Sequence, residues 1–225
     1  MTSAHFLTKQ SVVALVIFCL LGQAPRADAR DQAAVAWVDH GDAKLSLKRQ
    51  FDGDSFAMEF KSAKGRNTLR TFRLYGADCP ETDARGELLA SRIADQAKDF
   101  GCKPEEIPAL GREAEAFTGK LLSEGKPLIK TLGITGEKAP HGPKDPRRYY
   151  ALIEVTAPDG QRRMLHELLL EAGLARAHGQ AAPWPPDSTK LFGGERARKK
   201  FTDHLESLEK EAKHARRGAW KKGAP

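Results

Sequence analysis

The sequence is poor in cysteine and in long apolar runs. Only three of its 225 residues are cysteine, too few for a disulfide-dense small domain or for a four-cysteine zinc site. No two cysteines have CxxC spacing, and no two histidines have the HExxH spacing of zinc peptidases. Apart from one short N-terminal run, no stretch is long and apolar enough to cross a bilayer. These absences exclude small disulfide scaffolds, cysteine-rich zinc modules and multi-spanning membrane proteins.

The composition indicates a globular, basic protein. Apolar residues make up 40% of the chain and charged residues 30%, which is enough apolar content to bury a core, and the length fits one domain. Lysine and arginine number 37 against 30 aspartate and glutamate, a net charge of +7. A basic surface suits a polyanionic partner such as nucleic acid, an anionic lipid surface or a phosphorylated substrate. Charge alone does not choose among these three.

The first 29 residues have the organisation of a secretory signal. Lys9 precedes an apolar run at 12–22, and residues 27–29 read Ala-Asp-Ala, the small-x-small pattern of a cleavage site. We therefore expect an exported protein, periplasmic or extracellular, with no membrane span after cleavage. The apolar run is about a dozen residues long, which is short for a spanning helix, so an uncleaved anchor is the weaker alternative. A lipid anchor on Cys19 is weaker still, because the two residues before it are large.

The rest of the chain alternates short strands with helices. Asp52-Gly53-Asp54 is expected to break an alternating run at 45–60 into two strands, since Asp-Gly between apolar runs is a strong hairpin signal. Further strands are expected at 69–75, 128–132 and 149–155, and helices at 87–100, 112–122, 165–172 and 195–216. Five strands with interleaved helices indicate a small barrel with helices packed outside. The predicted organisation is a signal at 1–29, a short lead at 30–43, one domain at 44–221 and a tail at 222–225.

Polar residues gather where these strands end. They are Asp52, Asp54, Arg73, Asp78, Glu81, Arg147 and Arg148. In a closed barrel such segments can converge. Two aspartates would then form a hard, oxygen-only site suited to Ca²⁺ or Mg²⁺, and arginine forks would grip a phosphate. A further carboxylate could deprotonate the attacking water. Together these are the parts of a metal-assisted phosphodiesterase.

Each of these residues also has an ordinary structural interpretation. Asp52-Gly53-Asp54 alone is a turn, Asp78 and Glu81 beside a proline are typical loop or capping residues, and Arg147-Arg148 is typical of a solvated basic pair. Arg73 is the least ordinary, because two apolar strand residues flank it. The signals are specific only jointly and in this order.

Taken in that order, the residues resemble the staphylococcal nuclease (thermonuclease-like) family. The similarity is strongest at 72–82, which reads Phe-Arg-Leu-Tyr-Gly-Ala-Asp-Cys-Pro-Glu-Thr, and extends over most of 44–221. It implies a mainly β member of the α+β class: a five-stranded OB-fold barrel with three packed helices. The segment near 83–110 is longer than the family's usual connection and is expected to be a helical insertion.

The resemblance also implies roles for individual residues. Asp54 and Asp78 would bind Ca²⁺ through their carboxylates, and Cys79, where the family usually has threonine, would bind it through its backbone carbonyl. Arg73 and Arg148 would hold the scissile phosphate, and Glu81 would act on the water. The implied activity is Ca²⁺-dependent cleavage of single- or double-stranded DNA and of RNA, with low sequence specificity and 3′-phosphate products.

Further predictions concern the surroundings of this site. Lys144 and Arg147 are candidates for substrate binding, and Arg147 takes the role of the second catalytic arginine if the register slips by one. Trp184 either stacks on a base or packs on the barrel. Once the signal is removed only Cys79 and Cys102 remain, so in an oxidising compartment we expect a disulfide between them; the alternative is two unpaired thiols. The protein is expected to be a monomer.

Two other functions remain open. One is a catalytically inactive OB-fold module of the cell envelope that binds nucleic acid or a protein, since one fold hosts many functions. The other is an exported barrel with a structural or assembly role. The presence of every carboxylate and arginine that the family's chemistry needs favours the nuclease.

Overall fold

The computed structural model describes residues 37–46, 52–61, 65–83, 85–132, 148–177 and 193–221. All of them belong to the second of two compact units in the chain, residues 34–225. The predicted signal at 1–29, the tail at 222–225, and Lys144, Arg147 and Trp184 lie outside the described residues, so they stay predictions. Within the described ranges, no helix is long and apolar enough to cross a membrane.

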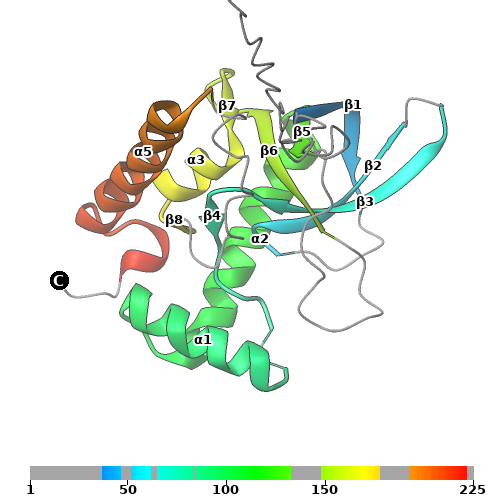
Figure 1. Ribbon diagram of the computed structural model, residues 1–225. Coiled ribbons are helices and arrows are strands. Elements are labelled where there is room, and N and C mark those ends of the chain that lie inside the picture. The colour runs from blue at the N-terminus through cyan, green and yellow to red at the C-terminus, as the bar shows by residue number, and fades with distance from the viewer. Residues whose placement is uncertain are drawn as a thin grey trace, which may run out of the picture. The chain divides into compact units, whose positions relative to one another are not determined.

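The fold is a curled sheet with helices packed against it (Figure 1). Six strands form the main sheet in the order β3-β2-β1-β5-β6-β7. Their bounds are Trp37–Leu45 for β1, Ser55–Lys61 for β2, Asn67–Leu74 for β3, Leu128–Leu132 for β5, Arg148–Thr156 for β6 and Arg162–Met164 for β7. β3 also pairs in parallel with β6, so β3, β2, β1, β5 and β6 form a closed ring of pairings. This confirms the predicted α+β fold with a five-stranded OB-type barrel.

Strand alternation decides which residues face the core. Phe56, Met58 and Phe60 of β2 are all buried on one face, as the period of two in the sequence requires. β2 and β3 pair antiparallel, with Ser55 opposite Arg73. This register brings the segment before β2 next to the end of β3.

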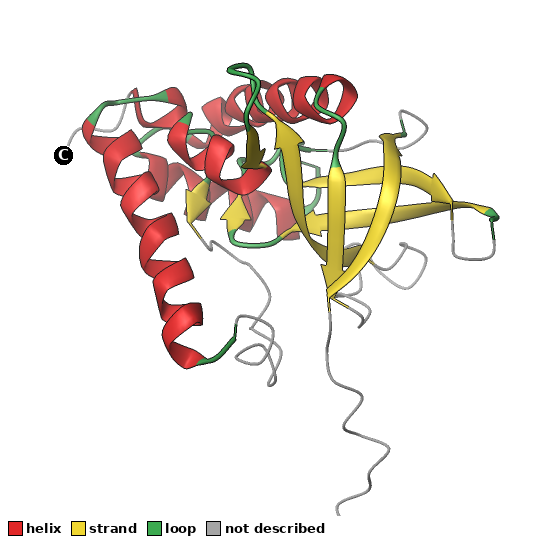
Figure 2. Cartoon of the chain, turned by 90° about the horizontal axis from the view of Figure 1, so that it is seen from above, coloured by secondary structure: helices red, strands yellow, loops and turns green. Residues whose placement is uncertain are grey.

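The α-helices of the described ranges lie mainly to one side of the strands (Figure 2). They are α1 at Glu87–Phe100, α2 at Ile107–Glu124, α3 at Leu165–Glu171 and α5 at Glu195–His214, with short 3₁₀ helices η1 at Pro104–Glu106 and η2 at Gly218–Lys221. α3 and α5 lie side by side (Figure 1). A two-stranded sheet joins β4, Ala77–Asp78, to β8, Arg176–Ala177.

The inserted helix α1 packs against other parts of the domain. The ring of Phe100 in α1 packs at a tilt against that of Trp220 in η2, with centroids 4.4 Å apart. Ile93 and Ile107 are buried in the same apolar cluster, together with Ala212 of α5. The predicted insertion therefore forms a second small core with the C-terminal part of the domain.

The larger differences from the sequence predictions concern β1, the connection that follows it, and α2. β1 falls almost wholly within the predicted lead at 30–43, yet it pairs with both β2 and β5. The connection from β1 to β2 is longer than a tight Asp-Gly turn, because β1 ends at Leu45 and β2 begins at Ser55. α2 begins at Ile107, ahead of the expected 112, because Pro108 lies in its first turn, where the missing N–H is not needed.

Candidate active site

The segment before β2 is fixed by its own hydrogen bonds. The backbone N–H groups of Asp54 and Ser55 donate to Oδ1 of Asp52, at 3.1 and 2.5 Å. Thr118 of α2 donates its hydroxyl to the backbone oxygen of Gly53 at 2.6 Å. These contacts turn the Asp54 side chain into the protein interior, where it is buried.

Gly53 is required here by close packing. A Cβ on this residue would lie 2.7 Å from Sγ of Cys79 and 2.7 Å from Cβ of Ala114. Only glycine allows the segment that carries Asp54 to approach the segment that carries Asp78 this closely.

Arg73 links the two predicted metal-binding aspartates. Its Nη1 pairs with Oδ1 of Asp54, and its Nη2 pairs with Oδ1 of Asp78 at 2.5 Å. Nη1 also donates to the hydroxyl of Ser55 at 3.2 Å. The guanidinium is buried, so these interactions operate at low effective dielectric.

Asp78 is surrounded by three guanidinium groups. Besides Arg73, Arg92 of α1 approaches its Oδ1 at 3.2 Å, and Arg176 of β8 donates from both Nε and Nη2 to its Oδ2. The β4–β8 pairing sets Arg176 directly opposite Asp78. Although burial alone would raise it, the charges of these three arginines hold the pKa of Asp78 below its ordinary value.

Fewer positive charges surround the carboxylate of Asp54 than that of Asp78. Burial raises its pKa well above the ordinary value, Arg73 offsets this only in part, and Asp52 and Asp78 add to the rise. The side chain accepts hydrogen bonds from Arg73, from the Ser55 hydroxyl at 3.0 Å and from the Cys79 backbone N–H at 2.6 Å. Asp54 is therefore the carboxylate in this cluster that most needs further positive charge.

Glu81 adjoins the cluster through Arg92. Its Oε1 lies 2.6 Å from Nη2 of Arg92, the same nitrogen that approaches Asp78. Burial raises the pKa of Glu81, while the charge of Arg92 opposes the rise. A carboxylate with a raised pKa and a fixed orientation is suited to accept a proton from water.

For Arg148 only the position of the backbone is described. It is the first residue of β6, in register with Thr71 of β3, two residues before Arg73. The other candidate, Arg147, precedes the described part of the strand.

The predicted disulfide between Cys79 and Cys102 is not formed. Cys79 is a free, buried thiol within the main core cluster, whereas Cys102 packs against the second cluster, around Phe100 and Trp220. The prediction rested on the count of cysteines left after signal removal and on the oxidising compartment, and not on where the insertion packs. Instead α1 and η2 hold Cys102 in a different core.

Sequence reasoning missed three residues of this cluster: Arg92, Gln96 and Arg176. The signal for two of them was present. Arg92 and Gln96 are four residues apart within the apolar face that Leu89, Ile93 and Phe100 define, and all five side chains are buried. A charged residue and an amide on the buried face of a helix indicate polar partners inside. Arg176 is paired with Asp78 across 98 residues, and nothing local in the sequence indicates that contact.

The donor set fits a hard cation in its chemistry. Carboxylate oxygens of Asp54 and Asp78 and the backbone oxygen of Cys79 are the ligand type that Ca²⁺ takes. In the structure each of these groups accepts hydrogen bonds from protein donors, among them Arg73 and Gln96. The described ranges hold no group of three or more His, Cys, Asp or Glu side chains arranged around one point. A cation bound here therefore requires the Arg73 guanidinium to move from at least one aspartate.

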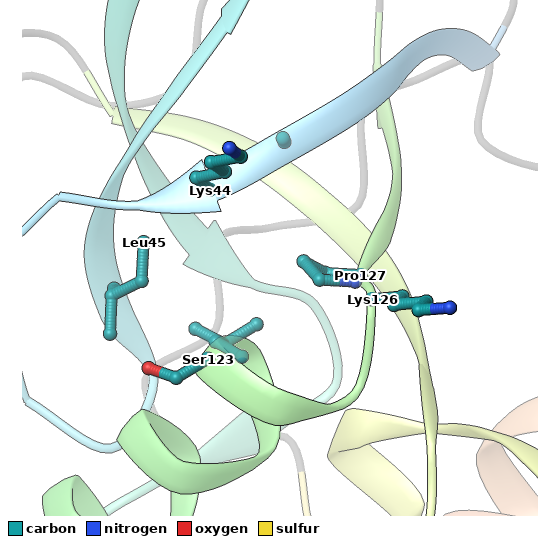
Figure 3. Close-up of a pocket in the computed structure, with 7 residues that line it drawn as sticks. Lys44, Leu45, Ser123, Lys126 and Pro127 are labelled. Carbon is teal, nitrogen blue, oxygen red and sulfur yellow. The ribbon is translucent and has the colours of Figure 1, made fainter.

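A separate pocket of about 560 Å³ lies between β1 and the end of α2 (Figure 3). Its walls include Lys44, Leu45, Leu122, Lys126 and Pro127. None of the carboxylates or arginines described above lines it, so it is distinct from the candidate site.

Comparison with known proteins places these observations in a family. The family model for staphylococcal nuclease homologues matches residues 71–222, a range that contains Arg73, Asp78, Glu81 and Arg148 but not Asp54. Among solved structures, the extended Tudor domain of Tudor-SN (p100) from Drosophila melanogaster is similar at 12% identity, over 79% of this chain and 67% of that chain, with a TM-score of 0.30. No curated protein matches the chain.

Proposed function

The chain belongs to the staphylococcal nuclease homologue family, and we propose that it hydrolyses phosphodiester bonds of nucleic acids at the site formed by Asp54, Arg73, Asp78 and Glu81. The observation that carries the proposal is the meeting of these side chains, from separate segments, in one buried cluster. Both DNA and RNA are proposed substrates, single- or double-stranded and with low sequence specificity, because the cluster offers contacts for a phosphate, which every such polymer carries.

The chemistry follows from the groups present. Arg73 is buried and presents a planar fork, which suits a phosphate oxygen pair and the negative charge that grows on it during hydrolysis. Glu81 would accept the proton of the attacking water. Arg148 is the proposed second phosphate-binding arginine. It pairs across the sheet with Thr71, two residues before Arg73 on β3.

Ca²⁺ is the proposed cofactor. Asp54, Asp78 and the backbone oxygen of Cys79 would hold it, and Arg73 would then turn from Asp54 towards the substrate phosphate. A bound divalent cation supplies positive charge to the phosphoryl oxygens and lowers the pKa of a coordinated water. The shortage of positive charge around Asp54 supports binding on that side of the cluster.

A second candidate is a nucleic-acid-binding module without catalysis. One observation favours it: both carboxylate oxygens of Asp78 already accept hydrogen bonds, from Arg73, Arg92, Arg176 and Gln96. A carboxylate with this many donors binds a cation only after some of them leave.

The test uses the purified full chain, supercoiled plasmid and single-stranded RNA, each with Ca²⁺ or with excess chelator. We expect cleavage of both polymers with Ca²⁺, loss of cleavage with chelator, and DNA ends that a ligase joins only after the 3′-phosphate is removed and the 5′-hydroxyl is phosphorylated. Retention of both polymers on the protein without cleavage in Ca²⁺ would favour the binding module instead.

We further propose that the protein is exported and acts as a monomer. The support for export is the signal-like sequence at 1–29. N-terminal sequencing of the protein from the producing cell should begin at Arg30, and light scattering should give the mass of one chain. A retained N-terminus at Met1 would contradict export by cleavage.

A further inference from the structure

The inserted helix α1 presents two polar side chains to the candidate site. Its buried face consists of Leu89, Arg92, Ile93, Gln96, Ala97 and Phe100. The apolar members pack α1 onto the domain. The two polar members, Arg92 and Gln96, instead contact residues 78–81, the segment that carries two of the proposed active-site carboxylates.

Gln96 holds the backbone of this segment on both sides of Pro80. Its Oε1 accepts the backbone N–H of Glu81 at 2.9 Å. Its Nε2 donates to the backbone oxygen of Cys79 at 2.9 Å and approaches Oδ2 of Asp78 at 3.3 Å. Gln96 is 0% exposed, so no water competes for these bonds, and one amide satisfies polar groups of three residues in the segment.

Arg92 holds the side chains of the same segment. One nitrogen, Nη2, lies 2.6 Å from Oε1 of Glu81 and 3.2 Å from Oδ1 of Asp78. The charge of this guanidinium allows two carboxylates to stay close together in a buried setting. Arg92 therefore fixes where the Glu81 carboxylate lies relative to Asp78.

Further contacts hold α1 and α2 against the segment at 78–81. Arg176 pairs with Asp99 of α1 and with Asp78 at the same time. On the other side of the segment, α2 approaches so closely that a Cβ on Gly111 would lie 2.4 Å from the backbone oxygen of Glu81. Residues 79–81 are thus confined between α1 and α2.

We propose that Gln96 and Arg92 are positioning residues that align Glu81 and Asp78 for the reaction. The inserted helix α1 then sets the positions of active-site carboxylates, in addition to packing against the domain. This inference rests on the proposed nuclease function, because Glu81 needs alignment only if it acts on water. Neither residue is proposed to touch the substrate.

The experiment compares Gln96→Met with the wild-type full chain and with Lys98→Met, a matched change on the exposed face of the same helix. Three quantities are measured: kcat and KM on a labelled oligonucleotide, hydrogen exchange of the Glu81 amide by NMR, and the melting temperature. For Gln96→Met we expect kcat to fall about 10- to 100-fold, since small misplacements of a reacting group have effects of this size. KM should stay near the wild-type value, and the Glu81 amide should exchange faster.

A second pair of variants tests the guanidinium of Arg92. Arg92→Lys keeps the charge beside Glu81 and should retain more kcat than Arg92→Met.

The possible results are distinct. Wild-type kcat in Gln96→Met, or unchanged exchange of its Glu81 amide, overturns the inference. A second pattern also overturns the inference, because it marks a purely structural residue. In that pattern kcat falls and KM rises by equal factors, the melting temperature falls, and amides across the chain lose protection from hydrogen exchange. Absence of cleavage by the wild type would contradict the proposed function, and the exchange data would still show whether Gln96 holds the segment.

Discussion

Arg73 pairs with Asp54 through one guanidinium nitrogen and with Asp78 through the other. The buried guanidinium of Arg73 thereby connects the segment that precedes β2 with strand β4. This connection lies at the end of the barrel where α1 and α2 pack. This relationship makes Arg73 important for stability as well as for phosphate binding.

Arg73→Ala should therefore destabilise the protein strongly. The substitution leaves Asp54 without its only guanidinium partner in the described part of the chain, and removal of one partner from a buried pair costs about 3–5 kcal/mol. Urea unfolding at neutral pH measures the loss. The control is Arg70→Ala, an exposed arginine on the same strand. Equal, small losses for both variants would contradict the assigned role of Arg73.

The pH dependence of stability should differ in sign between the two aspartates. The pKa of Asp54 is raised in the folded state, so stability is lost as pH rises through that value. The pKa of Asp78 is lowered, so its contribution is present above the ordinary carboxyl pKa and is lost as pH falls through the folded value.

In chelator, Asp54→Asn should become less destabilising relative to wild type as pH rises through the folded pKa of Asp54, because the wild type then loses stability and the variant does not. The change with pH is compared because asparagine also replaces one of the two oxygens that accept hydrogen bonds from Arg73, Ser55 and Cys79. Asp78→Asn is the matched control and should become more destabilising as pH rises through the ordinary carboxyl range. The account is wrong if the two differences in the free energy of unfolding change with pH in the same direction.

Gly53→Ala should weaken the close contact between the two aspartate segments. The new methyl group would overlap Sγ of Cys79 and Cβ of Ala114, each at 2.7 Å. Overpacking of this kind costs about 1–3 kcal/mol. Thermal unfolding should show the loss, and the double variant Gly53→Ala/Ala114→Gly should lose less stability than the sum of the two single variants, because it removes the Ala114 contact. Simple additivity would contradict a close contact between residues 53 and 114.

The Cys79 thiol should be unreactive in the folded protein. Burial raises its pKa, with Asp54 and the other nearby aspartates adding to the effect, so little thiolate forms at neutral pH. Alkylation followed by peptide mass analysis should label Cys79 only in denaturant. Recovery of a Cys79–Cys102 peptide from the native protein without reductant would contradict this structure of the site.

The barrel and the central arginine could be predicted because their signals are local. The alternation of Phe56, Met58 and Phe60 fixes the buried face of β2, and the motif around Arg73 and Asp78 is continuous in sequence. The predicted domain begins at residue 44 and so excludes most of β1, because that strand depends on pairing with β2 and β5, which no local pattern shows.

The surroundings of Asp78 were harder to predict. Arg92 and Gln96 reach it because the insertion folds back onto the site, and Arg176 reaches it through the β4–β8 pairing. The place of Cys102 was hard to predict for the same reason: it depends on the packing of the insertion against η2, which is a tertiary contact.

The most direct test of the central claim is the single-turnover cleavage rate of Glu81→Gln against wild type, in Ca²⁺, on one labelled oligonucleotide. Loss of a general base lowers the rate about 10²- to 10⁴-fold, and glutamine retains the size of the side chain, so we predict at least a hundredfold loss with the fold intact by circular dichroism. A variant that cleaves at the wild-type rate would contradict the assignment of this cluster as the catalytic site.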